Sequence, residues 1–280
     1  MGPHAASTLS KSLRLFSVAL VHPLEGYDRV HTLLELRRQR ARRPEEGVEY
    51  QEYQGQDPAH GLAVLESAAG IHLRSHLHEA ALAHLQSTME RSLKQLGNNC
   101  PFDLDHNGDP RLAATCYAIA RGLRPTRVVE TGVCYGVTSA CLLQALHQNR
   151  HGHLHSIDLP PLAKDADRHV GMLIPEELRS RWTLHRGTTV RLLPPLLQHL
   201  GQIDLFLHDS LHTYEHMRFE FDAGWAALRP GGLLISDDIQ GNRAFLEFVT
   251  RPDVRAAVVL RFSEGNALFG VAVKAAQAAQ

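Results

Sequence analysis

Short apolar runs alternate with helical patterns through the C-terminal part of the sequence. The runs that predict strands cover residues 127–131, 153–158, 182–187, 203–208, 232–237, 256–262 and 267–273. Helical periodicity fills the intervals between the first five of them, at 138–148, 175–181, 190–200 and 214–228. Strands alternating with helices predict an α/β fold, a doubly wound, mostly parallel, seven-stranded sheet with helices on both faces. The short "SEGN" link before the last run predicts a hairpin, so the last strand should be antiparallel.

The N-terminal part of the sequence has helical patterns rather than alternating strands and helices. Residues 29–47 and 78–99 have helical patterns, the first ended by Pro44 and Gly47 and the second by Gly97 and Asn98. We therefore expect a helical N-terminal extension or cap over 1–108 and a ligand-binding α/β domain over 109–280. The first helix is basic and amphipathic; a solvated helix face accounts for it better than contact with an anionic surface.

Composition narrows the classes of function. Apolar residues make up 44% and charged residues 21% of the 280 residues, and the net charge is −1. This balance lacks the basic excess of a general nucleic-acid binder, so no nucleic-acid partner is expected. The four cysteines form no CxxC pair, which favours a reducing cytoplasm. The apolar run 15–21 is too short to span a membrane and lacks a small-residue cleavage site, so neither membrane insertion nor secretion is expected.

In a doubly wound sheet the ligand lies beyond the carboxyl ends of the strands. The first strand ends in "ETGVCYG", where Glu130, Gly132 and Gly136 form an E-x-G-x-x-x-G turn and Thr138 opens the next helix. Glycines there let the backbone pass close to a ligand. The G-x-G-x-x-G dinucleotide fingerprint is absent, because Cys134 and Val137 occupy its later glycine positions. This makes a nicotinamide dehydrogenase a distant alternative.

The next two strand ends also carry polar side chains. Asp158 ends the second strand, where an acid can accept both hydroxyls of a ribose, although it can also cap a turn beside Pro160. Thr188 and Thr189 follow the third strand and suit either an adenine edge or a helix cap.

The order of E-T-G-V-C-Y-G, then I-D, then "LRPGGLLISDD" resembles the class I S-adenosylmethionine-dependent methyltransferases. The D-x-x-H-x-Y after the fourth strand is similar to the subgroup of metal-dependent sugar and natural-product O-methyltransferases. The resemblance covers roughly residues 110–273. It implies a Rossmann-like methyltransferase fold and S-adenosyl-L-methionine as cofactor. By that resemblance the cofactor-binding residues are Glu130, Gly132, Gly136, Thr138, Asp158, Thr188, Thr189 and Ser210.

Three aspartates follow the fourth and fifth strands. Asp209 comes directly after one strand, and Asp237 and Asp238 come after the other. If these strands are neighbours, the three carboxylates converge, and oxygen ligands with room for water and substrate suit Mg²⁺. The resemblance implies the same metal role. His212, three residues after Asp209, then suits the general base, since an ordinary imidazole pKa lies near ~6.5.

Other interpretations of these residues stay open. His208, His212 and His216 could bind zinc, but they share no regular element and no cysteine joins them. The expected activity is Mg²⁺-assisted O-methylation of a small hydroxylated molecule such as a sugar. Metal-independent methylation of nitrogen or an acidic oxygen, and a cofactor-binding regulatory module without turnover, are the alternatives. The sequence does not identify the acceptor, nor whether copies of the chain associate into a homo-oligomer.

Overall fold

The structure is a computed structural model of the 280-residue chain. It describes residues 15–42 except 17, 53–96, 102, 108–163, 165–263, 265 and 267–276, with the backbone alone at 39–42. The predicted end of the first helix at Gly47, the end of the second at Gly97 and Asn98, and Cys100 lie outside these residues.

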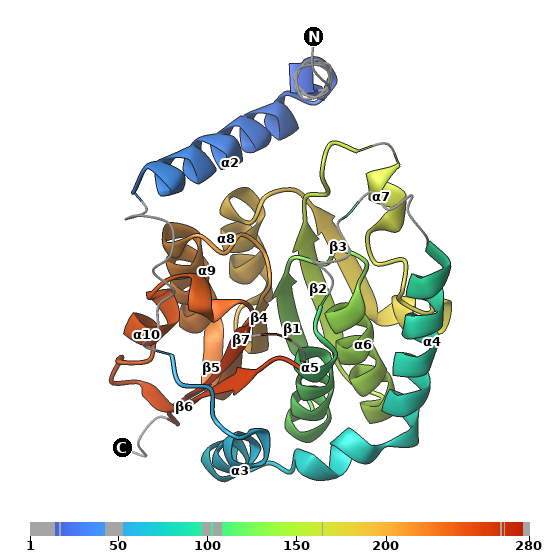
Figure 1. Cartoon of the computed structure of the whole chain (residues 1–280), viewed down its shortest axis with the longest axis vertical. Helices are drawn as coiled ribbons and strands as arrows, with labels where there is room; N and C mark the ends of the chain where they lie inside the picture. Colours follow the sequence, from blue (N-terminus) through green and yellow to red (C-terminus); the bar gives the residue numbers. More distant parts are fainter. Residues whose placement is uncertain are drawn as a thin grey trace.

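One seven-stranded sheet organises the described residues, in the order β3-β2-β1-β4-β5-β7-β6 (Figure 1). Neighbouring strands from β3 to β5 pair in parallel, and β7 runs antiparallel to both β5 and β6. The predicted doubly wound sheet with an antiparallel last strand is confirmed. The strands are β1 (Arg127–Thr131), β2 (His153–Asp158), β3 (Trp182–Arg186), β4 (Ile203–His208), β5 (Leu228–Ser236), β6 (Val254–Arg261) and β7 (Leu268–Lys274).

Helices cover both faces of the sheet, and each face has its own apolar core. One layer holds α3 (Pro58–Ala69), η1 (Arg74–His78), α4 (Ala80–Leu96), α5 (Pro110–Leu123), α6 (Val137–Asn149) and η3 (Glu176–Arg181). The other holds α8 (Thr189–Leu200), α9 (Tyr214–Ala227) and α10 (Ala244–Phe248). Two short elements, α7 (Ala166–His169) and η4 (Ile239–Gly241), lie in the loops after β2 and β5. Because helices cover both faces of the sheet, the central strands have apolar residues at consecutive positions rather than at every second position.

Two predicted elements differ from the observed ones. The structure starts β5 at Leu228, four residues before the predicted start, although the added segment contains Pro230 and Gly231. Both residues argue against a strand in a sequence, so the pairing of Ile203 with Leu228 comes from the neighbouring strand β4. The predicted helix over 175–181 is a single 3₁₀ segment.

The helices α3 and α4 pack on the α/β unit. Leu62 and Leu65 of α3 and Leu82 and Leu85 of α4 are buried in the same core as α5 and α6. Residues 58–96 therefore join the helical layer of the sheet, and the boundary expected at 108/109 stays a prediction.

The helix α2 (Pro23–Arg42) is different, because it crosses the carboxyl ends of the strands at the top of Figure 1. Among the described residues, no helix is long and apolar enough to cross a membrane.

Candidate active site

The glycine turn after β1 is locked to the end of β4. Gly132 has φ of 82°, and a Cβ atom there would lie 1.7 Å from the Asp209 carbonyl oxygen. The Asp209 N–H in turn donates to the Thr131 carbonyl at 2.8 Å. Any side chain at position 132 would push these segments apart, so the glycine holds Asp209 directly beside the turn.

Asp158 supports the same turn from β2. Its Oδ2 atom accepts the backbone N–H groups of Val133 and Cys134 at 2.8 and 2.9 Å. Burial raises the pKa of Asp158, and these two donors act in the opposite direction. Because Asp158 contacts the turn directly, a ligand that lies on the turn also lies beside this carboxylate.

Glu130 and Thr138 lie deeper than the sequence indicated. The Glu130 side chain is fully buried, and its oxygens accept hydrogen bonds from the hydroxyls of Thr138, Ser139 and Ser156 at 3.1, 2.6 and 2.6 Å. Burial raises the pKa of Glu130 to about 7, against the effect of these hydroxyls. The Glu130 carboxylate thus links β1 to α6 and β2. Its direct contact with a cofactor stays a prediction.

The two threonines after β3 have different surroundings. Thr188 is half-buried and caps α8 by position, without a side-chain capping bond. Thr189 is buried, and its hydroxyl lies 2.8 Å from His216 Nε2. Thr188 is therefore the more accessible of the two.

Three predicted residues meet beyond β4 and β5. One ligand-type atom each from Asp209, His212 and Asp237 lies within 4.8 Å of the others. This follows from the parallel pairing of β4 with β5, which aligns His208 with Ser236 and brings the following residues together. Among the described residues, this is a group of side chains that could hold a metal ion.

Asp238 lies to one side of this group. Its backbone is left-handed with φ of 45°, and its Oδ2 is 3.8 Å from His212 Nδ1. The group of potential ligands therefore contains His212, which we expected to act only as the base, while Asp238 lies beside the histidine.

The electrostatics of this group suit a cation. Burial, followed by the charge of Asp237, raises the pKa of Asp209 well above its usual value. Burial and Asp238 raise the pKa of Asp237 to about 7. The Asp237 Oδ1 atom is buried and accepts no hydrogen bond from the described residues. Two neighbouring negative charges and a buried oxygen without a hydrogen bond destabilise the folded chain. A divalent cation between the carboxylates would offset this repulsion, so these side chains fit a cation site.

A buried carboxylate that the sequence did not single out lies beneath these residues. Glu220 of α9 is fully buried, and its Oε2 atom lies 2.5 Å from Thr131 Oγ1 and 2.6 Å from His208 Nδ1. Its Oε1 atom lies 2.8 Å from Ser210 Oγ and 2.9 Å from His216 Nε2. One carboxylate therefore fixes the strand end before Asp209 and the loop after it. The i, i+4 spacing of His216 and Glu220 on α9 was the only sign of this contact in the sequence.

The histidines of this network are structural. His208 is fully buried, and His216 is buried as well. Burial alone would raise the pKa of Glu220, but His208 and His216 hold it well below its usual value. Burial lowers the pKa of His216, but Glu220 and Glu35 outweigh it and raise that pKa to about 9. His216 is therefore cationic at neutral pH.

The helix α2 forms a wall along this edge of the sheet through polar contacts. Glu25 binds Arg186 at the end of β3, Asp28 binds Arg191 at 2.8 Å, and Arg29 donates to the Pro160 carbonyl at 2.8 Å. Burial would raise the pKa of Glu25, but Arg186 and Arg29 lower it overall. Further along, Glu35 accepts from Thr213 Oγ1 at 2.6 Å. The contacts reach from the end of β3 to the loop that carries His212.

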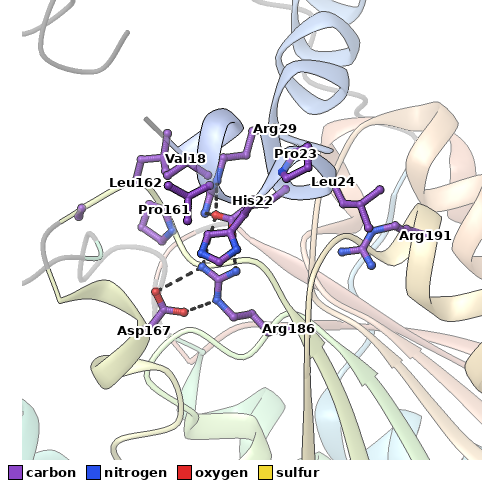
Figure 2. A pocket seen from close by; sticks show the side chains of 13 residues that line it. Val18, His22, Pro23, Leu24, Arg29, Pro161, Leu162, Asp167, Arg186 and Arg191 are labelled. Atoms are coloured by element: carbon purple, nitrogen blue, oxygen red, sulfur yellow. Dashed lines mark hydrogen bonds and ion pairs between the residues drawn. The ribbon is translucent and has the colours of Figure 1, made fainter. Parts of the chain in front are cut away.

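A cavity of about 920 Å³ lies between the start of α2 and the loop after β2. Figure 2 shows Arg186 beside Asp167 and below His22, with Pro161 and Leu162 near Val18 on one side and Arg191 on the other. The cavity lies beyond Asp158, at the edge of the sheet where doubly wound folds bind their ligands.

Residues 129–239 match a family model described as a methyltransferase domain. These residues therefore carry a methyltransferase domain. The match includes the glycine turn, Asp158, and the Asp209, His212 and Asp237 group. It ends before β6 and β7, which the structure adds to the same sheet.

Solved structures share the fold of this methyltransferase domain at low sequence identity. The O-methyltransferase TomG from Streptomyces achromogenes, involved in tomaymycin synthesis and bound to SAM, is 16% identical; the match covers 79% of this chain and 99% of that one, with a TM-score of 0.53. The O-methyltransferase from Bacillus cereus in complex with SAH is 15% identical, covering 77% and 99%, with a TM-score of 0.50. A methyltransferase from Geobacter sulfurreducens is 18% identical, covering 69% and 89%, with a TM-score of 0.50. No curated protein sequence matches the chain.

Proposed function

We propose that this methyltransferase transfers the methyl group of S-adenosyl-L-methionine to a hydroxyl oxygen of a small molecule, with the help of a divalent cation such as Mg²⁺. The observation that carries the proposal is the closeness of Asp209, His212 and Asp237 beside the glycine turn. The O-methyltransferases that share the fold, two of them with SAM or SAH bound, support the choice of cofactor and of oxygen as the acceptor atom.

The turn and the strand ends bind the cofactor. The backbone at Gly132 and Gly136 passes close to the methionine part, and Asp158 binds the ribose hydroxyls through the carboxylate that also supports the turn. Thr188 lies near the adenine, with Thr189 behind it. Ser210 acts through its bond to Glu220, and Glu130 with Thr138 fixes the turn from below.

The cation would be held by Asp209 and Asp237, with Asp238 at the side. When bound, it lowers the pKa of an acceptor hydroxyl and fixes its position. Such positioning is worth roughly 7–11 kcal/mol in well-oriented reactions. His212 takes the proton of the hydroxyl, whose oxygen attacks the methyl carbon in line with the departing sulfur. A C–O bond forms, the C–S bond breaks, and S-adenosylhomocysteine leaves as a neutral thioether.

His212 could also be a cation ligand, because one of its ring nitrogens lies within 4.8 Å of a carboxylate oxygen of Asp209 and of Asp237. An imidazole ligand would shift the preference from Mg²⁺ toward Mn²⁺ or Zn²⁺. The two roles are distinguished by the variant His212→Gln. If His212 is the base, kcat falls while the cation Kd changes little; if it is a ligand, the cation Kd rises at least tenfold.

The acceptor is a small hydroxylated molecule that enters between α2 and the carboxyl ends of the strands. The cavity beside Pro161, Leu162 and Arg186 supports a ligand of that size. Cytoplasmic location stays a prediction from the cysteines.

Isothermal titration of S-adenosylmethionine into the purified full-length chain tests the proposal. We expect micromolar binding that is lost in Asp158→Ala, with release of S-adenosylhomocysteine once a hydroxylated acceptor and cation are added. Absence of cofactor binding would contradict the proposal. Binding together with methyl transfer that persists in EDTA would favour the metal-independent alternative. Binding without turnover over a broad acceptor panel would favour a regulatory module.

A further inference from the structure

Three histidines lie side by side on one face of the sheet edge, outside the candidate active site. His153 and His155 are two residues apart on β2, so they point to the same face. His185 lies on the edge strand β3, and its Nε2 atom is 3.3 Å from Nδ1 of His155. Ile157 continues this face of β2 into the apolar core that contains Leu193 of α8. The three histidines are only half-buried, so solvent reaches this part of the face.

The separation of the two nearest imidazoles fits a shared cation. Zn–N bonds of about 2.0–2.1 Å at a tetrahedral Zn²⁺ ion put two imidazole nitrogens about 3.3–3.4 Å apart. The nitrogens of His155 and His185 are 3.3 Å apart, and their rings are stacked at an interplanar angle of 26°. A hydrogen bond joins these nitrogens in the cation-free chain. Both donors are therefore already in place before a cation arrives.

Both imidazoles are in the form that binds a cation. Burial, followed by the charges of His153 and His185, lowers the pKa of His155 to about 4. Burial, followed by the charge of His153, also lowers the pKa of His185. Both rings are therefore mainly neutral at pH 7, and a cation meets little competition from protons there.

The surroundings of the pair favour one class of cation. The charges of Arg127 and Arg181 contribute to the lowered pKa of His155 and of His153, respectively, so positive charge already lies nearby. Mg²⁺ prefers oxygen ligands, and the two facing atoms are nitrogens. Imidazole nitrogens suit Zn²⁺ and Cu²⁺, whose bonds to nitrogen are stronger. The site is therefore chemically different from the carboxylate group beyond β4 and β5.

We propose that His155 and His185 bind one Zn²⁺ ion, with water at the remaining coordination positions. His153 stays outside the ligand set, because its Nε2 atom is engaged at 2.8 Å by Thr183 Oγ1. The bound ion ties the edge strand β3 to β2. The proposal does not depend on methyl transfer.

Isothermal titration of Zn²⁺ into the full-length Asp237→Asn chain tests the site. This substitution removes a potential ligand of the candidate active site, so an ion that still binds has its ligands elsewhere. We expect one ion per chain with a micromolar Kd. The variants His155→Phe and His185→Phe, made in the same chain, should each raise this Kd at least tenfold. Phenylalanine keeps an aromatic ring on the strand and removes only the nitrogens.

The matched control is His153→Phe, which changes a half-buried histidine of the same face. It should change the Kd less than threefold. Circular dichroism establishes that each variant is folded. Long-range ¹H–¹⁵N spectra of the Asp237→Asn chain give a second measurement without a change at the site: Zn²⁺ should shift the imidazole nitrogens of His155 and His185 and leave those of His153 in place.

Any of three results would overturn the proposal. Absence of zinc binding up to ~100 µM would mean that the histidine pair is only a hydrogen bond. An unchanged Kd in His155→Phe, with its nitrogens unshifted in the spectra, would place the ion elsewhere. A loss in His153→Phe as large as that in His185→Phe would contradict the assignment of the two ligands.

Discussion

Two sets of carboxylates lie at the same end of the sheet, and they are supplied with hydrogen bonds very differently. Glu220 receives four side-chain partners, two on each oxygen, and its pKa lies well below the usual value. Asp209 and Asp237 face each other, with an unsatisfied buried oxygen on Asp237 and a raised pKa on both. Glu220 and Asp237 are both buried, so burial alone does not indicate function.

The difference lies in what completes each site. The Glu220 site is completed by the protein's own histidines and hydroxyls, which makes it a structural support for the loop that carries Asp209 and His212. The Asp209 and Asp237 site lacks positive charge of its own, and a cation would complete it. This comparison predicts opposite responses to neutralising a carboxylate in each place.

The largest effect is expected for Asp209→Asn. Methyl transfer should fall about 1,000-fold in kcat/KM, equivalent to ~4 kcal/mol, because the cation loses one of two direct ligands. In EDTA the variant should unfold at the same or a higher temperature than the wild type, since one of two repelling carboxylates is gone. Steady-state kinetics and differential scanning calorimetry measure the two effects.

Asp238→Asn is the control for charge at this position, because Asp238 lies beside the group rather than within it. It should lose about tenfold in kcat/KM. Equal losses in the two variants would show that Asp238 binds the cation as directly as Asp209 does. A lower melting temperature of Asp209→Asn in EDTA would contradict the assignment of a strained pair.

Glu220→Gln should behave in the opposite way. Removing the charge leaves the cationic His216 with Glu35 as its counter-charge and without the fully buried Glu220, so the free energy of unfolding should fall by about 3 kcal/mol. Urea unfolding in EDTA measures the loss. Asp222→Asn, an exposed carboxylate of the same helix that pairs with Arg251 at the surface, should change it by less than ~1 kcal/mol. A loss of stability below 1 kcal/mol in Glu220→Gln would mean that the network is not a support.

The same network should make stability depend on pH. The pKa of His216 is raised from 6.5 to about 9 in the folded chain, so its contribution is present below pH 6.5 and is lost as the pH rises through 9. We expect the wild type to lose about 2–3 kcal/mol of stability over this interval. The loss should be much smaller in His216→Gln, as urea unfolding at each pH would measure. An equal pH dependence in both proteins would assign it to other groups.

The smallest effect is expected for Glu130→Gln, which keeps the shape of a buried carboxylate bound to three hydroxyls. Stability should fall by about 1 kcal/mol, and the Kd for S-adenosylmethionine, measured by titration calorimetry, should change less than threefold. A rise of tenfold or more in this Kd with unchanged stability would instead make Glu130 a direct cofactor contact.

The sequence predicted the sheet well because its strands are buried on both faces and are followed by polar residues or glycines. No side chain from Leu205 to Leu207 faces solvent, and the same holds for Val128 and Val129. Their strands therefore lack alternating polar positions and are easy to recognise as apolar runs. The start of β5 at Leu228 could not be predicted, because it depends on pairing with Ile203 across a segment that contains Pro230 and Gly231.

The candidate site was predicted in part for a related reason. Asp209 and Asp237 follow strands directly, so knowing that β4 and β5 are neighbours is enough to place them together. The contacts of Glu220 with Thr131 and His208 join residues 89 and 12 positions apart, and no local pattern indicates them. The polar contacts of α2 with Pro160, Arg186 and Arg191 were also hidden, since the sequence does not say which side of a helix meets the protein.

Titration of Mn²⁺ into the purified chain with S-adenosylhomocysteine, followed by electron paramagnetic resonance, tests the central claim most directly. We expect one bound ion per chain, at least 100-fold weaker binding in Asp237→Asn, and wild-type binding in the folded fraction of Glu220→Gln. Absence of a bound ion, or binding that Asp237→Asn leaves unchanged, would contradict the claim that the undersatisfied carboxylates form a cation site.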